Sequence, residues 1–194
     1  AWAASGGGGE WAGYGAVEEG VRGGLGRAWV VVDGGVTVGA LVAANPTGQG
    51  TMGDCAHFGA ARFEIGGEFG GLGTRPDAVP FAESAATKRD SLEALRNTTL
   101  AIVATDAKMT KAQLKRVAVA AHDGMARAIS PSHTLVDGDL VFALSTGVDG
   151  HPTDDLLALE IGAAAANCLA RAIARAAYSA RPESGDILPT RRGK

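Results

Sequence analysis

The sequence predicts an α/β fold, because strand patterns and helix patterns alternate along its second half. An apolar, β-branched run begins at Thr98, and a helical pattern follows from Thr110. A second strand-like region surrounds residues 137–145, and another helical pattern starts near Thr153. This order is typical of α/β proteins. With 194 residues, 46% of them hydrophobic and only 5% aromatic, the chain is expected to be a single domain whose core is made of small aliphatic side chains.

The first half predicts a hairpin between two less regular segments. Residues 1–28 are rich in glycine and are expected to be mostly loop. The valines of residues 30–32 and the run 36–44 form two apolar strands around an Asp-Gly-Gly turn. Residues 46–97 are too long for an ordinary connection and are expected to form a functional or disordered loop, with a short helix over about residues 82–95.

Two helices are predicted after Thr98. Thr110 and Gln113 have capping-box spacing, and the apolar residues that follow lie on one helix face: Leu114, Val117, Ala118, Ala121, Met125 and Ala128. Pro131 is expected to close this helix. The helix near Thr153 is apolar on nearly all sides, so it should lie between other elements. The turn residues of Asp137-Gly138-Asp139 predict a second hairpin-like strand region between the two helices.

Composition excludes several classes of function. Eighteen basic against 21 acidic residues give a net charge of −3, which argues against a polybasic protein that binds nucleic acid or membrane surfaces. The two cysteines and four histidines lack zinc-ligand spacing, and the glycine runs lack the ending of a phosphate-binding loop. We therefore expect no metal and no cofactor. The sequence shows no long uncharged apolar run and no signal-like N-terminus, which predicts a cytoplasmic location.

Residues 96–147 (RNTTLAIVATDAKMTKAQLKRVAVAAHDGMARAISPSHTLVDGDLVFALSTG) closely resemble the start of the β-subunit of the DmpA-like aminopeptidases and the 6-aminohexanoate-oligomer (nylon-oligomer) hydrolases. Upstream, RGGLGRAWVVVDGGVTVGALVAAN and GGEFGGLG resemble the α-subunit of that family in the same order. The resemblance implies a four-layer αββα sandwich, related to that of the ornithine acetyltransferases. It divides the chain into an α-like segment, 1–97, and a β-like segment, 98–194. Relatives carry further sequence before the glycine-rich region, so the fold is expected to be incomplete at its N-terminus.

The same resemblance implies that the chain cuts itself between Asn97 and Thr98. Thr98 would then be both the nucleophile and, through its new α-amine, the base. The chemistry requires such a base, because a threonine hydroxyl is a weak nucleophile on its own. An α-amine with a reference pKa of about 7.7 to 8.0 suits this role near neutral pH. From the residues alone, Asn97-Thr98-Thr99 favours an ordinary turn and strand start over a catalytic role, or a glycosylation acceptor if the protein is secreted.

Four further residues acquire roles through the resemblance. Asp137 and Asp139 match an acidic pair that would hold and tune the α-amine. Asn45 matches an asparagine whose side-chain amide contributes to the oxyanion hole. Arg22 stands where many relatives have a lysine that polarises the site, and arginine does not readily give up a proton. Without the resemblance, the aspartates indicate a solvated turn and Asn45 indicates the opening of a turn.

The function implied is hydrolysis of small peptides or amides, either N-terminal amino acyl amides or 6-aminohexanoate oligomers, by a homo-oligomer of αβ units. Two alternatives stay open. One is an acyltransferase like the ornithine acetyltransferases, in which an amine replaces water as the acceptor. The other is a non-catalytic, truncated assembly module, which is favoured by the missing N-terminal part and by Arg22 and Arg27, where the family pattern differs.

Overall fold

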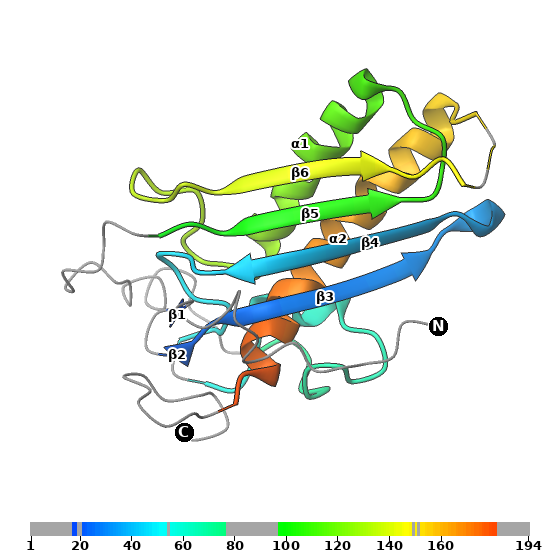
Figure 1. Ribbon diagram of the computed structural model, residues 1–194. Helices are drawn as coiled ribbons and strands as arrows, with labels where there is room; N and C mark the ends of the chain where they lie inside the picture. The colour runs from blue at the N-terminus through cyan, green and yellow to red at the C-terminus, as the bar shows by residue number, and fades with distance from the viewer. Residues whose placement is uncertain are drawn as a thin grey trace.

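The computed structural model describes residues 17–18, 21–53, 55–76, 97–148, 150 and 152–181. Its main sheet has the strand order β3-β4-β5-β6, and a separate two-stranded pair joins β1 to β2 (Figure 1). The strands are β1 (Val17–Glu18), β2 (Val21–Arg22), β3 (Gly24–Val31), β4 (Thr37–Ala44), β5 (Leu100–Thr105) and β6 (Leu140–Ser145). The helices are α1 (Lys111–Ala128) and α2 (Asp155–Ser179), with short 3-10 turns η2 (Asp33–Gly35) and η3 (Gly59–Phe63).

The predicted hairpin of the first half is confirmed. Strands β3 and β4 are antiparallel and are joined by the η2 turn, where Gly34 has a φ of 82°. Residues 1–28 were expected to be mostly loop, but strand β3 begins at Gly24, so this expectation is wrong for residues 24–28. The reason is packing: a Cβ atom at Gly26 would lie 1.9 Å from the main-chain oxygen of Ala172 in α2. Glycine in this part of the chain allows a helix to approach the strand closely.

The second hairpin expected around Asp137-Gly138-Asp139 is wrong. Strand β5 pairs with β4 in antiparallel fashion, but β6 pairs with β5 in parallel fashion. Parallel neighbours need a crossover, and α1 provides it. Asp137-Gly138-Asp139 therefore immediately precedes β6. Because β5 and β6 are parallel, this segment lies at the end of the sheet where β5 also begins.

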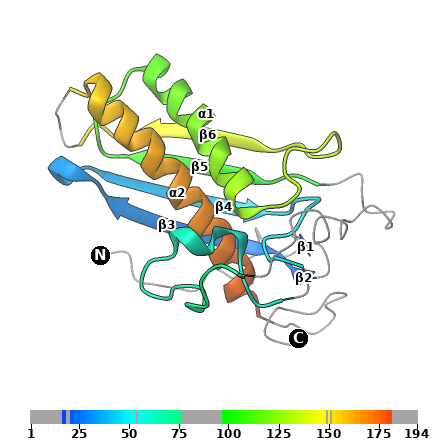
Figure 2. The same ribbon diagram turned by 180° about the vertical axis from the view of Figure 1, so that it is seen from behind.

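Both helices lie on one face of the sheet (Figure 2). The capping box predicted at Thr110 and Gln113 is present, and α2 begins with the Asp154 side chain accepting a 2.8 Å hydrogen bond from the Leu157 N–H. Most of α2 is buried against β3, β4 and α1, as its apolar sequence predicts. In the described part of the chain, α2 is the one helix long and apolar enough to cross a membrane, and its packing identifies it as a core helix. The helix predicted over residues 82–95 lies outside the described residues.

The opposite face of the sheet carries large apolar side chains that no described element covers. Trp29 and Phe142 are each 56% exposed, and the others on this face are Val31, Leu41, Leu100, Ile102, Leu140 and Leu144. Sheets of a sandwich pack through such faces. The described residues thus form two layers, one sheet and one layer of helices. This confirms the predicted α/β class and is consistent with a sandwich.

Candidate active site

Three segments far apart in the sequence meet at one end of the sheet. Residues 45–47 follow β4, residues 97–99 precede β5, and residues 134–139 precede β6. Strand β4 runs antiparallel to β5, and β6 runs parallel to β5. The last residue of β4 and the first residues of β5 and β6 therefore lie at the same end of the sheet. This end of the sheet is at the left of Figure 1. The topology, rather than any local motif, assembles the site.

The predicted cleavage junction between Asn97 and Thr98 lies at this end of the sheet. The Thr98 N–H donates to the main-chain oxygen of Asn45 at 2.9 Å. The Thr98 hydroxyl donates to the carbonyl oxygen of Asn97 at 2.7 Å, and the Gly138 N–H donates to that same oxygen at 2.9 Å. Asn97 is only 3% exposed. The Gly138 bond belongs to the parallel bridge between Asn97 and Asp137, and a main-chain N–H fixed in this way is also a group that can donate to an oxyanion.

Gly138 also leaves space for the candidate nucleophile. Its neighbour Asp137 forms an isolated parallel bridge with Asn97, which brings residue 138 beside residue 98. A Cβ atom at residue 138 would lie 2.8 Å from Thr98 Oγ1, closer than such contacts occur in proteins. The residue between the two predicted aspartates is therefore part of the site. Sequence reasoning assigned it only to a turn, because nothing local shows what it touches.

Asp137 is held by four hydrogen bonds. One carboxylate oxygen accepts from the Thr47 N–H at 2.9 Å and from the Thr47 hydroxyl at 2.8 Å. The other accepts from the Thr134 N–H at 2.9 Å and from the Thr134 hydroxyl at 2.6 Å. Burial by itself raises the pKa of this carboxyl, but the bonds from Thr134 and Thr47 outweigh it, so the pKa lies below its ordinary value. A carboxylate has about four lone-pair sites, and here all are used.

Asp139 has fewer partners. One oxygen accepts from the Thr99 N–H at 2.9 Å, and the other lies 2.8 Å from Nδ1 of His133. The Asp139 side chain is 5% exposed, whereas that of His133 is 36% exposed. Each Asp139 oxygen therefore retains capacity for another donor. The two aspartates, equivalent in the sequence prediction, differ in how far their acceptor sites are filled.

The structure brings together five of the six residues predicted for the site and its junction: Asn45, Asn97, Thr98, Asp137 and Asp139. The main-chain oxygen of Asn45 accepts the Thr98 N–H, and the role of its side-chain amide in the oxyanion hole stays a prediction. Arg22 is described only as a strand residue of β2, paired with Val17, and its side chain lies outside the description. Sequence reasoning missed Gly138, Thr47, Thr134 and His133. Thr47 is 90 positions from Asp137, and no sequence signal links the two.

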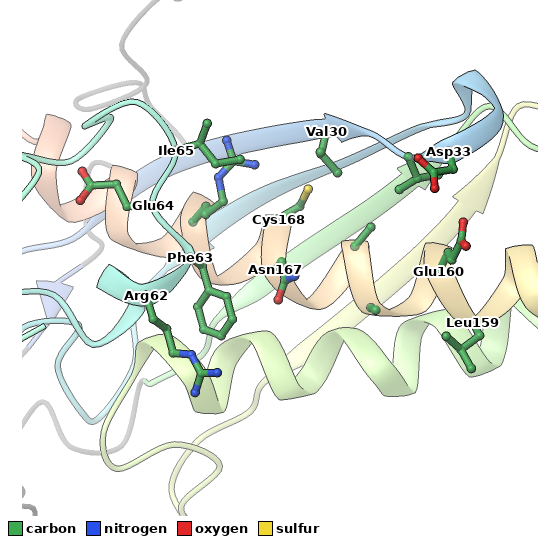
Figure 3. A pocket seen from close by; sticks show the side chains of 14 residues that line it. Val30, Asp33, Arg62, Phe63, Glu64, Ile65, Leu159, Glu160, Asn167 and Cys168 are labelled. Atoms are coloured by element: carbon green, nitrogen blue, oxygen red, sulfur yellow. The ribbon is translucent and has the colours of Figure 1, made fainter. Parts of the chain in front are cut away.

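A separate hollow of about 610 Å³ lies on the helix-covered side of the molecule, lined by parts of β3, η3 and α2 (Figure 3). None of the predicted site residues lines it. It contains Cys168, and burial raises the pKa of that thiol to about 11, so the thiolate is scarce near neutral pH. Among the described residues, no group of three or more His, Cys, Asp or Glu side chains is placed to hold a metal ion.

Comparison with known proteins gives the family. The profile of peptidase family S58 matches residues 3–187. The chain belongs to peptidase family S58. An "uncharacterized aminopeptidase" of Mycobacterium leprae is 40% identical over 189 residues, 92% of this chain and 50% of the relative. A 6-aminohexanoate-oligomer endohydrolase of Kocuria is 39% identical over 57 residues, 29% of this chain and 16% of the relative. These matches confirm the family inferred from residues 96–147.

Solved structures support the fold of this S58 chain. The L-aminopeptidase D-Ala-esterase/amidase of Ochrobactrum anthropi, described as a variant of the Ntn hydrolase fold, aligns with a TM-score of 0.61 at 24% identity, over 92% of this chain and 46% of that one. A Pyrococcus horikoshii protein aligns with a TM-score of 0.60 at 26% identity, over 89% of this chain and 44% of that one. The chain spans about half the length of the mycobacterial relatives it matches.

Proposed function

We propose that this S58 chain forms the reactive part of an amide hydrolase that cuts itself between Asn97 and Thr98 and then uses Thr98 as its nucleophile. One observation carries the proposal. The Thr98 hydroxyl and the Gly138 N–H converge on the carbonyl oxygen of Asn97, at 2.7 and 2.9 Å. The bond that the sequence predicts to break is thus the one whose carbonyl already has a neighbouring nucleophile and an oxyanion donor.

In the self-cleavage step, Thr98 Oγ1 forms a bond to the carbonyl carbon of Asn97. The bond from that carbon to the Thr98 nitrogen breaks, and the hydroxyl proton passes to the nitrogen. Water then hydrolyses the resulting ester and leaves a carboxylate on Asn97 and a free α-amine and hydroxyl on Thr98. The Gly138 N–H stabilises the charge on the oxygen during the attack, an effect typically of about 10² to 10³ in rate.

In the mature enzyme, the Thr98 α-amine takes the proton of its own hydroxyl as that hydroxyl attacks a substrate amide. The new amine inherits the position of the present amide nitrogen, 2.9 Å from the main-chain oxygen of Asn45. Asp139 accepts from the N–H of the following residue, Thr99, and we propose that its remaining acceptor capacity serves the new amine. The leaving amine receives the proton, and water releases the acyl group from Thr98. The Asn45 side-chain amide is the proposed second donor to the oxyanion.

The substrate class we propose is a short peptide or amide with a free amino group, including ω-amino-acid oligomers. Support comes from the relatives, which are named as aminopeptidases and as 6-aminohexanoate-oligomer endohydrolases. A free amine on the substrate suits the negative charge of Asp137 and Asp139, because this charge attracts a cation even though the lone pairs of Asp137 are filled.

A substrate panel tests this proposal. The protein, expressed from its complete gene, is incubated with alanine p-nitroanilide, β-alanine p-nitroanilide and a 6-aminohexanoate trimer, and product release is followed. Hydrolysis of at least one, with little release from the matched N-acetylated compound, is expected. The acyltransferase alternative predicts acyl transfer to added ornithine in preference to water. No release from any substrate, together with an uncut chain, contradicts the proposed function.

A further inference from the structure

His133 occupies an unusual backbone position beside the proposed site. It lies in the turn between α1 and β6, and its φ is 54°, in the left-handed region. Residues other than glycine adopt this region infrequently, although asparagine, aspartate and histidine do so more often than the rest. Such a conformation persists where contacts of the surrounding structure hold it.

The His133 ring joins Asp139 to helix α1. Its Nδ1 lies 2.8 Å from one Asp139 oxygen, while the other Asp139 oxygen accepts from the Thr99 N–H. Its Nε2 lies 3.4 Å from the main-chain oxygen of His122, and the two imidazole rings pack edge to face at 5.1 Å. Because a carboxylate only accepts hydrogen bonds, Nδ1 carries the hydrogen in the contact with Asp139. The main-chain oxygen of His122 also only accepts, so the Nε2 contact is a hydrogen bond only in a ring that carries hydrogen on both nitrogens. The ring thus contacts the carboxylate that accepts from Thr99, the residue after Thr98.

Among the described residues, few charged groups lie close to His133. Asp139 faces it directly, Asp137 lies on the same approach to β6, and His122 faces it from α1. Burial, with a contribution from His133 itself, lowers the pKa of His122, so His122 is neutral near pH 7. Lys115 and Asp123, also on α1, act on His122 with opposite signs. Asp139 is therefore the charged partner in direct contact with the His133 ring.

We propose that His133 is a positioning residue of the hydrolase site. Its Nδ1–H holds one oxygen of Asp139, which keeps the other oxygen on the N–H of Thr99, the residue that follows the proposed nucleophile. This inference rests on the proposed function. It assigns the fixing of Asp139 to His133, whereas Asp137 is fixed by threonines on both of its oxygens.

Three variants at this position separate the hydrogen bond from the backbone conformation. His133→Asn tolerates the left-handed backbone and offers an amide N–H in place of Nδ1–H. His133→Asp tolerates the same backbone, and aspartate has nearly the same shape as asparagine, but it presents a second carboxylate to Asp139 in place of a donor. His133→Gly relaxes the backbone and removes the side chain. Comparing Asn with Asp therefore isolates the donor.

We expect His133→Asn to retain self-cleavage and kcat within about threefold. His133→Asp and His133→Gly should lose about 10- to 100-fold in kcat with little change in KM, because a misplaced group near the reacting atoms costs rate. Tm measurements check that all three fold. In an Asp139→Asn background, His133→Gly should have little further effect, since its role passes through Asp139. Equal activity in all variants, or an Asn variant as slow as the Asp variant, overturns the inference.

A failure of the proposed function gives a different result. If the wild-type protein neither cuts itself nor hydrolyses the panel, the proposed function fails before any variant is compared. The pairing is then judged by long-range ¹H–¹⁵N NMR of the histidine rings, which reports which nitrogen carries hydrogen. Hydrogen on Nδ1 of His133 supports the positioning of Asp139. A neutral ring with hydrogen on Nε2 alone overturns it.

Discussion

The helix-covered face of the sheet is packed mainly from small apolar side chains, above all alanine and valine, whereas the Thr98 end of the same sheet is organised by polar groups. On the covered face, α2 approaches β3 so closely that Gly26 has no room for a Cβ atom. At the Thr98 end, Asp137 alone accepts four hydrogen bonds. Side-chain volume limits which substitutions the helix-covered face tolerates. Hydrogen-bond partners limit which substitutions the Thr98 end tolerates. Substitutions in the two regions should therefore change different measurements.

Thr98→Ala should have the largest effect. It removes the hydroxyl that contacts the Asn97 carbonyl, so both self-cleavage and amide hydrolysis should fall to background. Tm should change little, because the side chain is half-buried at the sheet edge. Thr98→Ser is the matched control and should retain both activities. Cleavage of the alanine variant at the same bond would contradict the role of Thr98.

Gly26→Ala should have the largest effect on stability. Its Cβ would lie 1.9 Å from a main-chain oxygen of α2, which cannot move without shifting the helix. We expect a loss of about 3 kcal/mol in the free energy of unfolding, measured in urea. Gly39→Ala is the control on β4, because its Cβ would meet nothing closer than 3.7 Å. Equal stability of the two variants would show that the close packing of α2 on β3 is not needed.

Gly138→Ala should damage chemistry more than stability. The new Cβ would lie 2.8 Å from Thr98 Oγ1 and should displace the hydroxyl from the Asn97 carbonyl. The rate of self-cleavage, followed by intact mass over time, should fall about 10²-fold. Gly39→Ala again serves as control, with an unchanged rate. Unchanged cleavage in Gly138→Ala would remove Gly138 from the site.

Asp137→Asn should have a moderate, pH-dependent effect on stability. An amide NH₂ would oppose the two donors of either Thr47 or Thr134, so we expect a loss of about 2 kcal/mol at pH 7. The pKa of Asp137 lies below its ordinary value of 3.8, so this carboxylate stabilises the fold above that pH and stops doing so as the pH falls through its folded pKa. Urea unfolding at pH 7 and pH 3 should show that the difference in free energy of unfolding between wild type and variant is smaller at pH 3. A gap that widens in acid would contradict this account.

Sequence patterns predicted the parts of this molecule whose structure depends on neighbours in the chain. The capping box of Thr110 and Gln113 and the apolar, β-branched run after Thr98 act over a few residues, and α1 and β5 formed where expected. The path between α1 and β6 was not predictable in this way, since the parallel pairing of β6 depends on where α1 crosses. For the same reason Asp137-Gly138-Asp139 was assigned to a hairpin.

The site was predicted through resemblance in its residue types but not in its contacts. Thr98 and the two aspartates were identified from residues 96–147, but their difference in hydrogen bonding depends on Thr47 and His133, which reach them through the fold. The Gly138 N–H is a main-chain group, so no residue pattern announces its role as a donor. Three-dimensional proximity, rather than residue type, carries this information.

Intact-mass measurement of the purified protein, with N-terminal sequencing of any fragments, tests the central claim most directly. The account predicts cleavage of the bond after Asn97, with a new fragment that begins Thr-Thr-Leu and accumulates at neutral pH. The fragment should be absent from Thr98→Ala. An intact chain in protein that nevertheless hydrolyses the substrate panel, or a fragment that begins at another residue, would contradict Thr98 as the self-activated nucleophile.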